Sequence, residues 1–162
     1  MCFICYLLRT LFNLLKLRKK RIGESKAVIA AVYVVMFILW FSWFQMCFAD
    51  PMEISLPLWL RFVGLACFIA GVVLFVFSQV RMRGFEDRGH LVAEGIYSRI
   101  RNPMYLGFII WVIGFPIFLQ RLLSLSLSVI WIMHFMIWKT LEERELEKKY
   151  PEYAEYKEKT WF

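Results

Sequence analysis

The sequence has few of the residues on which soluble enzymes commonly build their sites. It contains only two histidines, His90 and His134, and four cysteines among 162 residues. No GxGxxG loop follows a strand pattern, no helical HxxxH occurs, and no nucleophile elbow or Ser/His/Asp set is evident. The sequence therefore gives no support to a Rossmann cofactor site, a zincin-type metal site or a hydrolase triad. It also lacks internal repeats and low-complexity segments, and its length predicts one domain.

The four cysteines do not form the pattern of a disulfide framework. Cys47 and Cys67 fall inside apolar runs, and Cys2 and Cys5 lie beside the first methionine. The CxxC spacing of the first pair is weak support for metal or redox chemistry, because no second pair or histidine accompanies it. We expect interfacial thiols that are open to acylation, and no bound metal.

Apolar residues dominate the chain. They make up 60% of it, against about 45–50% in soluble domains. Twenty basic and 13 acidic residues give a net charge of +7. A soluble core of this size cannot bury so much apolar surface, so an ordinary cytosolic enzyme is disfavoured. The apolar composition also disfavours a disordered chain, and the cysteine pattern disfavours a secreted scaffold. The predicted class is an all-α integral membrane protein.

Four uncharged stretches predict about four transmembrane helices: 27–49, 62–80, 104–120 and 122–138. Each of the last two has 17 residues, which span about 25 Å of a layer that is about 30 Å thick. Only Arg121 separates them, so we expect a tight antiparallel hairpin. Gly114 and Pro116 are expected to bend its first arm.

The basic residues predict the orientation of the chain. Seven precede the first stretch, five follow the second and six follow the fourth, which leaves only Arg61 and Arg121 near the opposite face. Cytoplasmic flanks carry the excess of lysine and arginine. We therefore expect both termini and the loop 81–103 to be cytoplasmic, and the segment 50–57 to face outward.

Residues 1–26 are interpreted as an interfacial segment. Arg9 and Asn13 interrupt an apolar stretch of 15 residues, and the basic cluster KLRKKR follows at 16–21. This order is wrong for a signal peptide. It predicts an amphipathic helix in the cytoplasmic interface, with anionic lipid headgroups as partners of the cluster. Nucleic acid is the disfavoured alternative, because the cluster adjoins a membrane span.

The segment 89–107 holds the first candidate site. Asn102 and Pro103 predict the N-cap and first residue of the third span. Arg99 and Arg101 lie just upstream, where the partial positive charge of the helix end favours a carboxylate or a phosphate. A capped helix whose arginines lie at lipid headgroups explains the same residues.

The segment 140–156 holds the second candidate site. It is expected to extend the fourth helix, break near Pro151 and form a short helix that carries Tyr153 and Tyr156. Glu142 falls on the apolar stripe of the extended helix, so its carboxylate is expected to face inward and to need a cationic partner. The alternative is a solvated charge run.

Together the two segments offer cations and backbone donors, carboxylates, and aromatic rings between them. Such a set suits a zwitterionic ligand with a carboxylate, an amine and a ring. S-adenosylmethionine fits this description, and NADPH fits it in part. We expect His134, deep in an apolar span, to pair with a neighbouring helix.

Four motifs occur in a recognisable order: LVAEGIY at 91–97, RNPMYLG at 101–107, EE at 142–143 and YAEY at 153–156. The order resembles the isoprenylcysteine carboxyl methyltransferase and phospholipid methyltransferase superfamily, whose pattern is LVxxGxY, RHPxYxG, EExxL and YxxY. The resemblance covers residues 81–160. The N-terminal half is similar only as hydrophobic spans.

The resemblance implies a membrane methyltransferase that binds S-adenosylmethionine in a cytoplasmic pocket. Its catalytic core would be 81–162, with the hairpin 104–138, preceded by two transmembrane helices within 27–80. The residues implied to bind the cofactor are His90, Leu91, Gly95, Ile96, Tyr97, Asn102, Pro103, Tyr105, Glu142 and Glu143. The residues implied to take part in catalysis are Arg101 and Glu142.

The chain departs from the family pattern at two places. Asn102 stands where the family usually has histidine, which removes any role that needs an imidazole. Relatives often place an arginine a few residues after the YxxY pair, whereas here the sequence reads Thr160, Trp161 and Phe162.

A lipophilic acceptor entering from the membrane is implied, most simply a prenylcysteine carboxylate. With a pKa of about 3.5, that group is ionised at neutral pH and needs no base. Arg101, together with Arg99, is hypothesised to steer it. A phospholipid amine is the alternative, with Glu142, Glu143 or a water chain as base, and a thiol is another. Further alternatives are an NADPH-dependent lipid reductase, similar in its C-terminal membrane region, and a non-enzymatic membrane scaffold.

Overall fold

The computed structural model describes residues 2–18, 26–83, 91 and 93–162. Over these residues the protein is all-α, and isolated bridges at Glu53/Arg121 and Ile100/Trp161 are its only β-type pairings. The elements are α1 (Cys2–Arg18), α3 (Lys26–Ala49), α4 (Leu58–Arg83), the 3-10 turn η2 (Gly95–Ser98), α5 (Pro103–Leu119), α6 (Leu122–Lys149) and α7 (Tyr153–Lys159).

Three helices of the described chain are long and apolar enough to cross a membrane. They contain the candidate spans Ala30–Ala49, Leu58–Val80 and Leu122–Lys149. α5 is also apolar but has only 17 residues. The predicted class of all-α membrane protein is therefore confirmed, and α3 and α4 include the two stretches expected at 27–49 and 62–80.

α4 and α5 lie against each other through glycines. Gly64 faces Gly114 and Gly71 faces Gly107, so the two helices run antiparallel and each presents a glycine every seven residues. A Cβ atom on any of these four glycines would lie 2.6–2.8 Å from the carbonyl oxygen of the facing glycine. Small residues allow helix backbones to approach closely in membranes. Gly114, expected to bend the hairpin arm, thus has a packing function.

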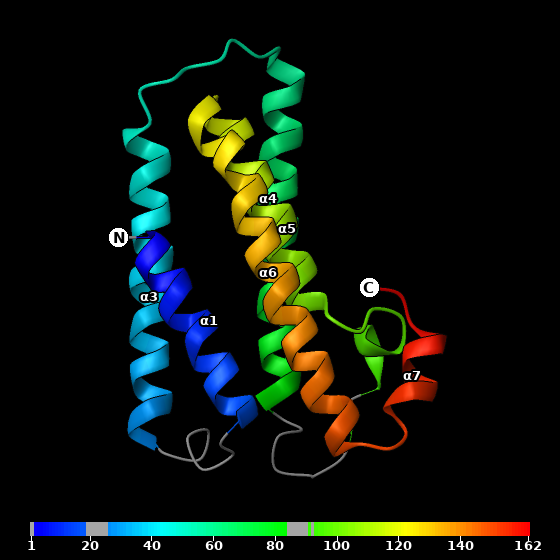
Figure 1. Ribbon diagram of the computed structural model, residues 1–162. Helices are drawn as coiled ribbons and strands as arrows, with labels where there is room; N and C mark the ends of the chain where they lie inside the picture. Colours follow the sequence, from blue (N-terminus) through cyan, green and yellow to red (C-terminus); the bar gives the residue numbers. More distant parts are fainter. Residues whose placement is uncertain (1, 19–25, 84–90, 92) are drawn as a thin grey trace.

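The N-terminal helix packs against the bundle. α1 lies along α3 and α6 (Figure 1). The Tyr6 ring stacks on Trp131 with a centroid separation of 4.4 Å, and Nε1 of Trp138 donates a hydrogen bond to Thr10 Oγ1 (2.8 Å). The ring of His134 lies 5.0 Å from that of Tyr6. As a result α1 reaches the half of α6 that carries its charged residues.

The turn between α5 and α6 closes with a left-handed residue. Gln120 has φ 59°, and the N–H of Arg121 donates to the Pro116 carbonyl (2.9 Å). This six-to-one hydrogen bond is that of a Schellman motif, which normally carries glycine at the left-handed position. The side chain of Gln120 compensates, because its Oε1 accepts a hydrogen bond from the Leu56 N–H (3.1 Å).

The loop between α3 and α4 caps this turn. Oδ2 of Asp50 accepts hydrogen bonds from the N–H and the hydroxyl of Ser124, in the first turn of α6, at 2.6 and 2.8 Å. Arg121 Nη1 donates to the Asp50 carbonyl and to Glu53. Burial of Asp50 opposes its charge, but the hydrogen bonds from Ser124 and Met52 outweigh this and lower its pKa. The two connections at this end are thereby fastened together.

Candidate functional site

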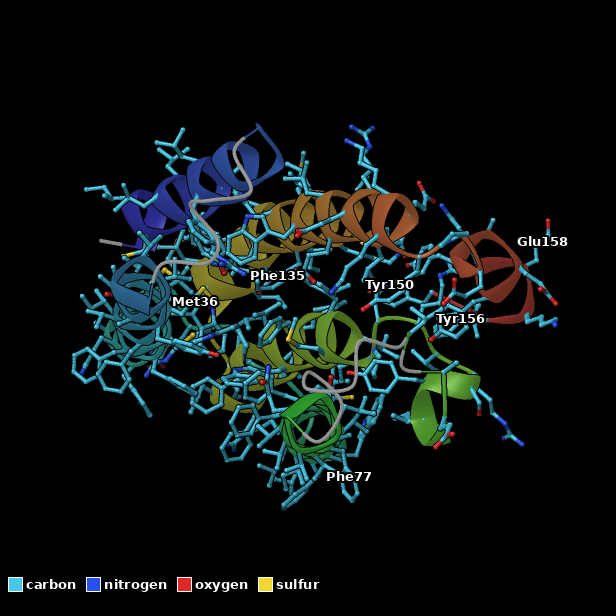
Figure 2. The ribbon with its side chains drawn as sticks, turned by 90° about the horizontal axis from the view of Figure 1, so that it is seen from below. Met36, Phe77, Phe135, Tyr150, Tyr156 and Glu158 are labelled. Atoms are coloured by element: carbon cyan, nitrogen blue, oxygen red, sulfur yellow. The ribbon has the colours of Figure 1, made fainter. Side chains whose placement is uncertain are left out.

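The loop before α5 turns Tyr97 into the bundle. Gly95 opens η2 with φ 64°, a conformation that glycine adopts without steric cost. Tyr97 is buried, and its hydroxyl lies 2.6 Å from Ser78 Oγ on α4. The Tyr156 hydroxyl donates to the Tyr97 carbonyl at 2.6 Å, and Figure 2 shows Tyr156 where α7 meets this turn. Burial first, and the negative charge of Glu142 as well, raise the pKa of Tyr97.

α5 begins at Pro103, as predicted, but the predicted side-chain cap at Asn102 is wrong. The Asn102 side chain makes no capping hydrogen bond. Its Nδ2 instead donates to Oε1 of Glu143 (2.6 Å) and to the Phe162 carbonyl (3.0 Å). The physical reason is that two acceptors, the buried carboxylate of Glu143 and the Phe162 carbonyl, orient the amide through its Nδ2.

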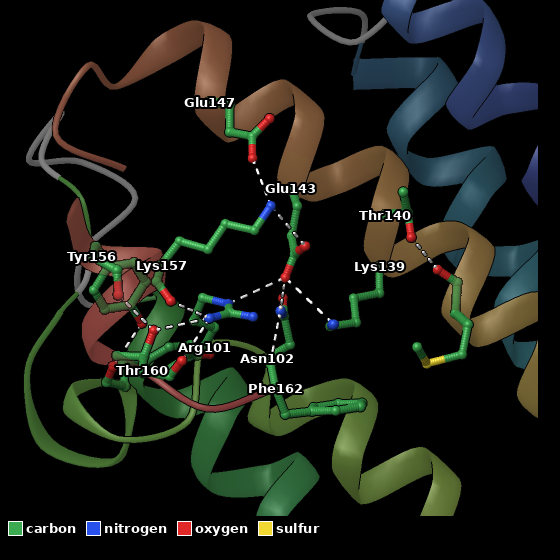
Figure 3. A network of polar contacts seen from close by, with 12 residues as sticks. Arg101, Asn102, Lys139, Thr140, Glu143, Glu147, Tyr156, Lys157, Thr160 and Phe162 are labelled. Carbon is green, nitrogen blue, oxygen red and sulfur yellow. Dashed lines mark hydrogen bonds and ion pairs between the residues drawn. The ribbon is translucent and has the colours of Figure 1, made fainter. Parts of the chain in front are cut away.

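Glu143 is the centre of a polar network (Figure 3). Its side chain is buried, and Oε1 lies 3.4 Å from Arg101 Nε and 3.5 Å from Lys139 Nζ. Oε2 lies 4.0 Å from Lys157 Nζ. A buried carboxylate is stable only with such partners. Glu143 therefore joins α6, the start of α5 and α7.

Arg101 fastens the tail to the loop before α5. Its Nη1 donates to the carbonyls of Lys157 and Thr160, both at 2.6 Å. The backbone adds a pairing, because the N–H of Arg101 donates to the Trp161 carbonyl and the N–H of Trp161 donates to the Arg99 carbonyl. Nothing in the sequence pattern indicated that residues 160–162 would lie along 99–102. The guanidinium of Arg101 thus binds protein carbonyls as well as Glu143.

Glu142 faces a different set of partners. Its Oε1 lies 3.8 Å from Nη2 of Arg9 on α1, which is the cationic partner that the sequence required. Its charge acts on the hydroxyls of Tyr97 and Tyr105, and Tyr105 is only 2% exposed. The side chain of Glu142 remains 35% exposed, against 9% for Glu143. Two tyrosines therefore lie within electrostatic reach of a partly accessible carboxylate at the start of α5.

The remaining predicted site residues lie around this point or on the approach to it. Asn102, Pro103 and Glu143 are buried there, and Gly95 and Ile96 form η2, which presents Tyr97. Leu91 is half-buried in the preceding loop. His90 lies outside the described residues. Within the described ranges no group of three His, Cys, Asp or Glu side chains is arranged to hold a metal ion.

This helical membrane bundle with its polar junction at the start of α5 belongs to a known family. A sequence profile of the phospholipid methyltransferase family matches residues 59–153, more than half of the chain. The chain is therefore a member of this family, and the resemblance drawn from its motifs is confirmed. The matched region runs from α4 to the first residue of α7, so α1 and α3 lie outside it.

Curated relatives from yeast and rice are similar in sequence. The protein-S-isoprenylcysteine O-methyltransferase of Saccharomyces cerevisiae is 38% identical over 90 residues, covering 51% of this chain and 36% of the yeast protein. The probable protein-S-isoprenylcysteine O-methyltransferases of two rice subspecies are 28% identical over 109 residues, covering 60% of this chain and 57% of theirs. The chain thus spans about a third to somewhat over half of these relatives. No solved structure matches.

Proposed function

We propose that this chain is a membrane methyltransferase that uses S-adenosylmethionine and acts on the carboxylate of a lipophilic acceptor of the prenylcysteine type. The observation that carries the proposal is that Tyr97 and Tyr105 both lie within electrostatic reach of Glu142 near the start of α5. The family profile and the names of the yeast and rice relatives support the reaction and the acceptor.

The donor set suits the proposed cofactor. Glu142 is a partly accessible carboxylate, which matches an ammonium group or ribose hydroxyls. The rings of Tyr97 and Tyr105 match a sulfonium and an aromatic base, because a cation is attracted to the face of an aromatic ring. Asn102 and Glu143 would support the start of α5 through their hydrogen bond, and Pro103 would start the helix that carries Tyr105. Leu91, Gly95 and Ile96 would line the side toward η2.

For this reaction the protein needs mainly to align the acceptor with the methyl donor and to exclude water. S-adenosylmethionine supplies an activated methyl group, which passes to a carboxylate oxygen as the carbon–sulfur bond breaks and the sulfur keeps the bonding pair. An ionised carboxylate requires no proton transfer. Arg101 contributes by holding α7 and residues 160–162 against the loop before α5. Its additional role in steering the acceptor, with Arg99, is part of this proposal.

The proposed arrangement in the membrane has four crossings, with α5 as the short one. The loop 50–57 and the α5–α6 turn lie at one end of the bundle, and the charged end of α6 and α7 lie at the other (Figure 1). Since 18 of the 20 basic residues lie in the sequence segments 9–26, 81–101 and 139–159, which flank the proposed spans on one side, both termini and the site would be cytoplasmic. Residues 1–26 would bind anionic headgroups, although 19–21 of the basic cluster lie outside the described residues.

Transfer of a labelled methyl group tests the proposal. Purified protein is incubated with methyl-labelled S-adenosylmethionine, total lipid and a prenylated peptide, and the labelled fraction is then identified. We expect a base-labile methyl ester on the peptide. Glu142→Gln should abolish most of the transfer, whereas Glu158→Gln, at an exposed position of α7, should not change it. Tight binding of NADPH without methyl transfer would indicate a reductase, and binding of neither cofactor would indicate a scaffold.

A phospholipid amine is the second candidate acceptor. The description of the matched family as phospholipid methyltransferase favours it. This acceptor must lose a proton before it attacks, and Glu142 is the accessible carboxylate that would serve as base. Base-stable label in the phospholipid fraction, with a rate that rises with pH, would identify this reaction in place of ester formation.

A further inference from the structure

A cation from outside the family region reaches the candidate site. Arg9 belongs to α1, whereas the family profile begins at residue 59. Its Nη2 lies 3.8 Å from Glu142, and its guanidinium lies 5.9 Å from the centre of the Trp138 ring and 5.4 Å from that of Phe12. Arg9 also acts electrostatically on Tyr105. The N-terminal helix thus supplies a positive charge next to the carboxylate and tyrosines described above.

This arginine has unused capacity to bind an anion. Its Nε is buried and has no hydrogen-bond partner among the described residues, and its contact with Glu142 is long for a charge-assisted hydrogen bond. Arg101 differs, because its Nη1 donates to two carbonyls at 2.6 Å. The planar guanidinium of arginine is well suited to a carboxylate. Arg9 is therefore the cation at this site with a donor left over.

Arg9 is one of the residues that line an apolar groove. The groove lies between α1 and α3 and has a volume of about 340 Å³, within the range of about 300–1,000 Å³ typical of small-ligand sites. One lining residue is charged, Arg9, and the other seven are apolar: Leu8, Phe12, Ala27, Val28, Ala31, Val32 and Val35. A groove lined by one cation and seven apolar residues matches a molecule with an apolar chain and a single anionic group.

We propose that the α1–α3 groove binds the apolar chain of the acceptor and that Arg9 binds its carboxylate. This inference rests on the proposed function and names a specificity residue for it. The carboxylate would lie beside Glu142, where the cofactor is proposed to bind. An ammonium headgroup would instead meet the like charge of Arg9, so the arrangement selects an anionic acceptor over a phospholipid amine.

Equilibrium binding and methyl transfer with two ligands test Arg9. The ligands are N-acetyl-S-farnesylcysteine and its uncharged carboxamide. In Arg9→Met we expect the Kd and KM for the carboxylate to rise about tenfold or more, as for loss of a charged hydrogen bond. Affinity for the carboxamide should stay within about twofold of the wild type. Arg9→Lys should restore part of the loss, and Arg144→Met, at an exposed position of α6, should cause none.

The groove is tested separately. Ala31→Phe fills it and should weaken binding of the carboxylate and the carboxamide alike, whereas Ala30→Phe, at an exposed neighbouring position that does not line the groove, should weaken neither. Competition with phosphatidylserine identifies any other occupant. If the phospholipid displaces the farnesyl ligands at equal concentration and in an Arg9-dependent way, the groove holds bulk anionic lipid and the proposal is wrong.

The outcomes separate this inference from the proposed function. If the wild type transfers methyl groups but Arg9→Met changes only the affinity for S-adenosylmethionine, Arg9 is a counterion of Glu142 and the inference fails. Equal losses for carboxylate and carboxamide in Arg9→Met would also overturn it, since they indicate a structural role. If the wild type binds the carboxylate in an Arg9-dependent way but transfers no methyl group, the binding site stands and the proposed function fails.

Discussion

Replacing Gly107 by alanine adds one methyl group where α4 and α5 lie backbone to backbone. The new Cβ would be 2.7 Å from the Gly71 carbonyl oxygen and 3.1 Å from the Phe75 nitrogen. Real Cβ atoms essentially never approach a neighbour within 3.0 Å, so the helices must shift apart by a few tenths of an ångström at this point. Because backbone atoms make the contact, no side-chain rotation relieves it.

The sign of the effect is what makes this substitution informative. In an isolated helix, alanine is more stable than glycine by about 0.8–1.0 kcal/mol. Overpacking of a close contact costs about 1–3 kcal/mol. We therefore expect a net loss of up to about 2 kcal/mol and a decrease of up to a few degrees in the thermal unfolding midpoint in detergent. Ala66→Val, on the exposed face of α4, should change the midpoint little.

The same displacement should reach the site. Tyr105 is carried by α5, whereas Tyr97 is held to Ser78 of α4. Separation of the two helices moves one tyrosine relative to the other, and small misplacements of catalytic groups lower rates strongly. We expect methyl transfer to fall about tenfold. Gly71→Ala should lower the unfolding free energy less in the Gly107→Ala background than in the wild type, because the helices are already apart. A raised unfolding midpoint in Gly107→Ala would refute the close approach of the two backbones.

Three further substitutions test the connections around the site. Glu143→Gln should cost about 2–4 kcal/mol of unfolding free energy, because it leaves Arg101 and Lys139 buried without their carboxylate. Glu147→Gln, at an exposed ion pair, should cost less than about 1 kcal/mol. Equal losses for the two variants in chemical denaturation would contradict the network. Asp50→Asn should cost about 1–2 kcal/mol of unfolding free energy at pH 7. Because the fold lowers the pKa of Asp50, the stabilisation by its carboxylate is present above the unfolded-state pKa and is lost as the pH falls through the folded-state pKa. The advantage of the wild type over Asp50→Asn should therefore disappear in strong acid. Tyr156→Phe removes the donor to the Tyr97 carbonyl and should lower stability by about 1 kcal/mol and also lower methyl transfer. Tyr150→Phe is the control. Identical behaviour of the two variants would show that the hydrogen bond does not position Tyr97.

The apolar runs predicted the helices better than their ends. The second run was expected to start at residue 62 because Arg61 is charged, yet α4 starts at Leu58. Arg61 is accommodated inside the helix because its Nε donates to the Phe118 carbonyl at the end of α5 (3.4 Å). A partner on another helix cannot be inferred from hydropathy. The extension of the last long helix to Lys149 and the break before Tyr153 were predictable, because Pro151 and the change in composition are local signals.

The candidate site was predictable as motifs but not as contacts. The need of Glu142 for a cation follows from the cost of burying a carboxylate, and this part of the reasoning required no fold. That the cation is Arg9 depends on how α1 docks, through Tyr6 among the aromatic residues of α6. The interaction of Asn102 with Glu143 was missed for the same reason, since capping was weighed without the carboxylate that competes for the amide.

The two adjacent glutamates of α6 have different surroundings because of helix geometry. Successive residues of an α-helix point about 100° apart, so Glu142 and Glu143 address different neighbours. Glu142 faces α1 and the two tyrosines and stays partly exposed, whereas Glu143 is buried against Asn102 and Arg101. It follows that neutralising Glu142 should lower methyl transfer with little loss of stability, and that neutralising Glu143 should lower stability first. Under the proposed function, this paired motif would combine one residue for the ligand with one for the framework that presents it.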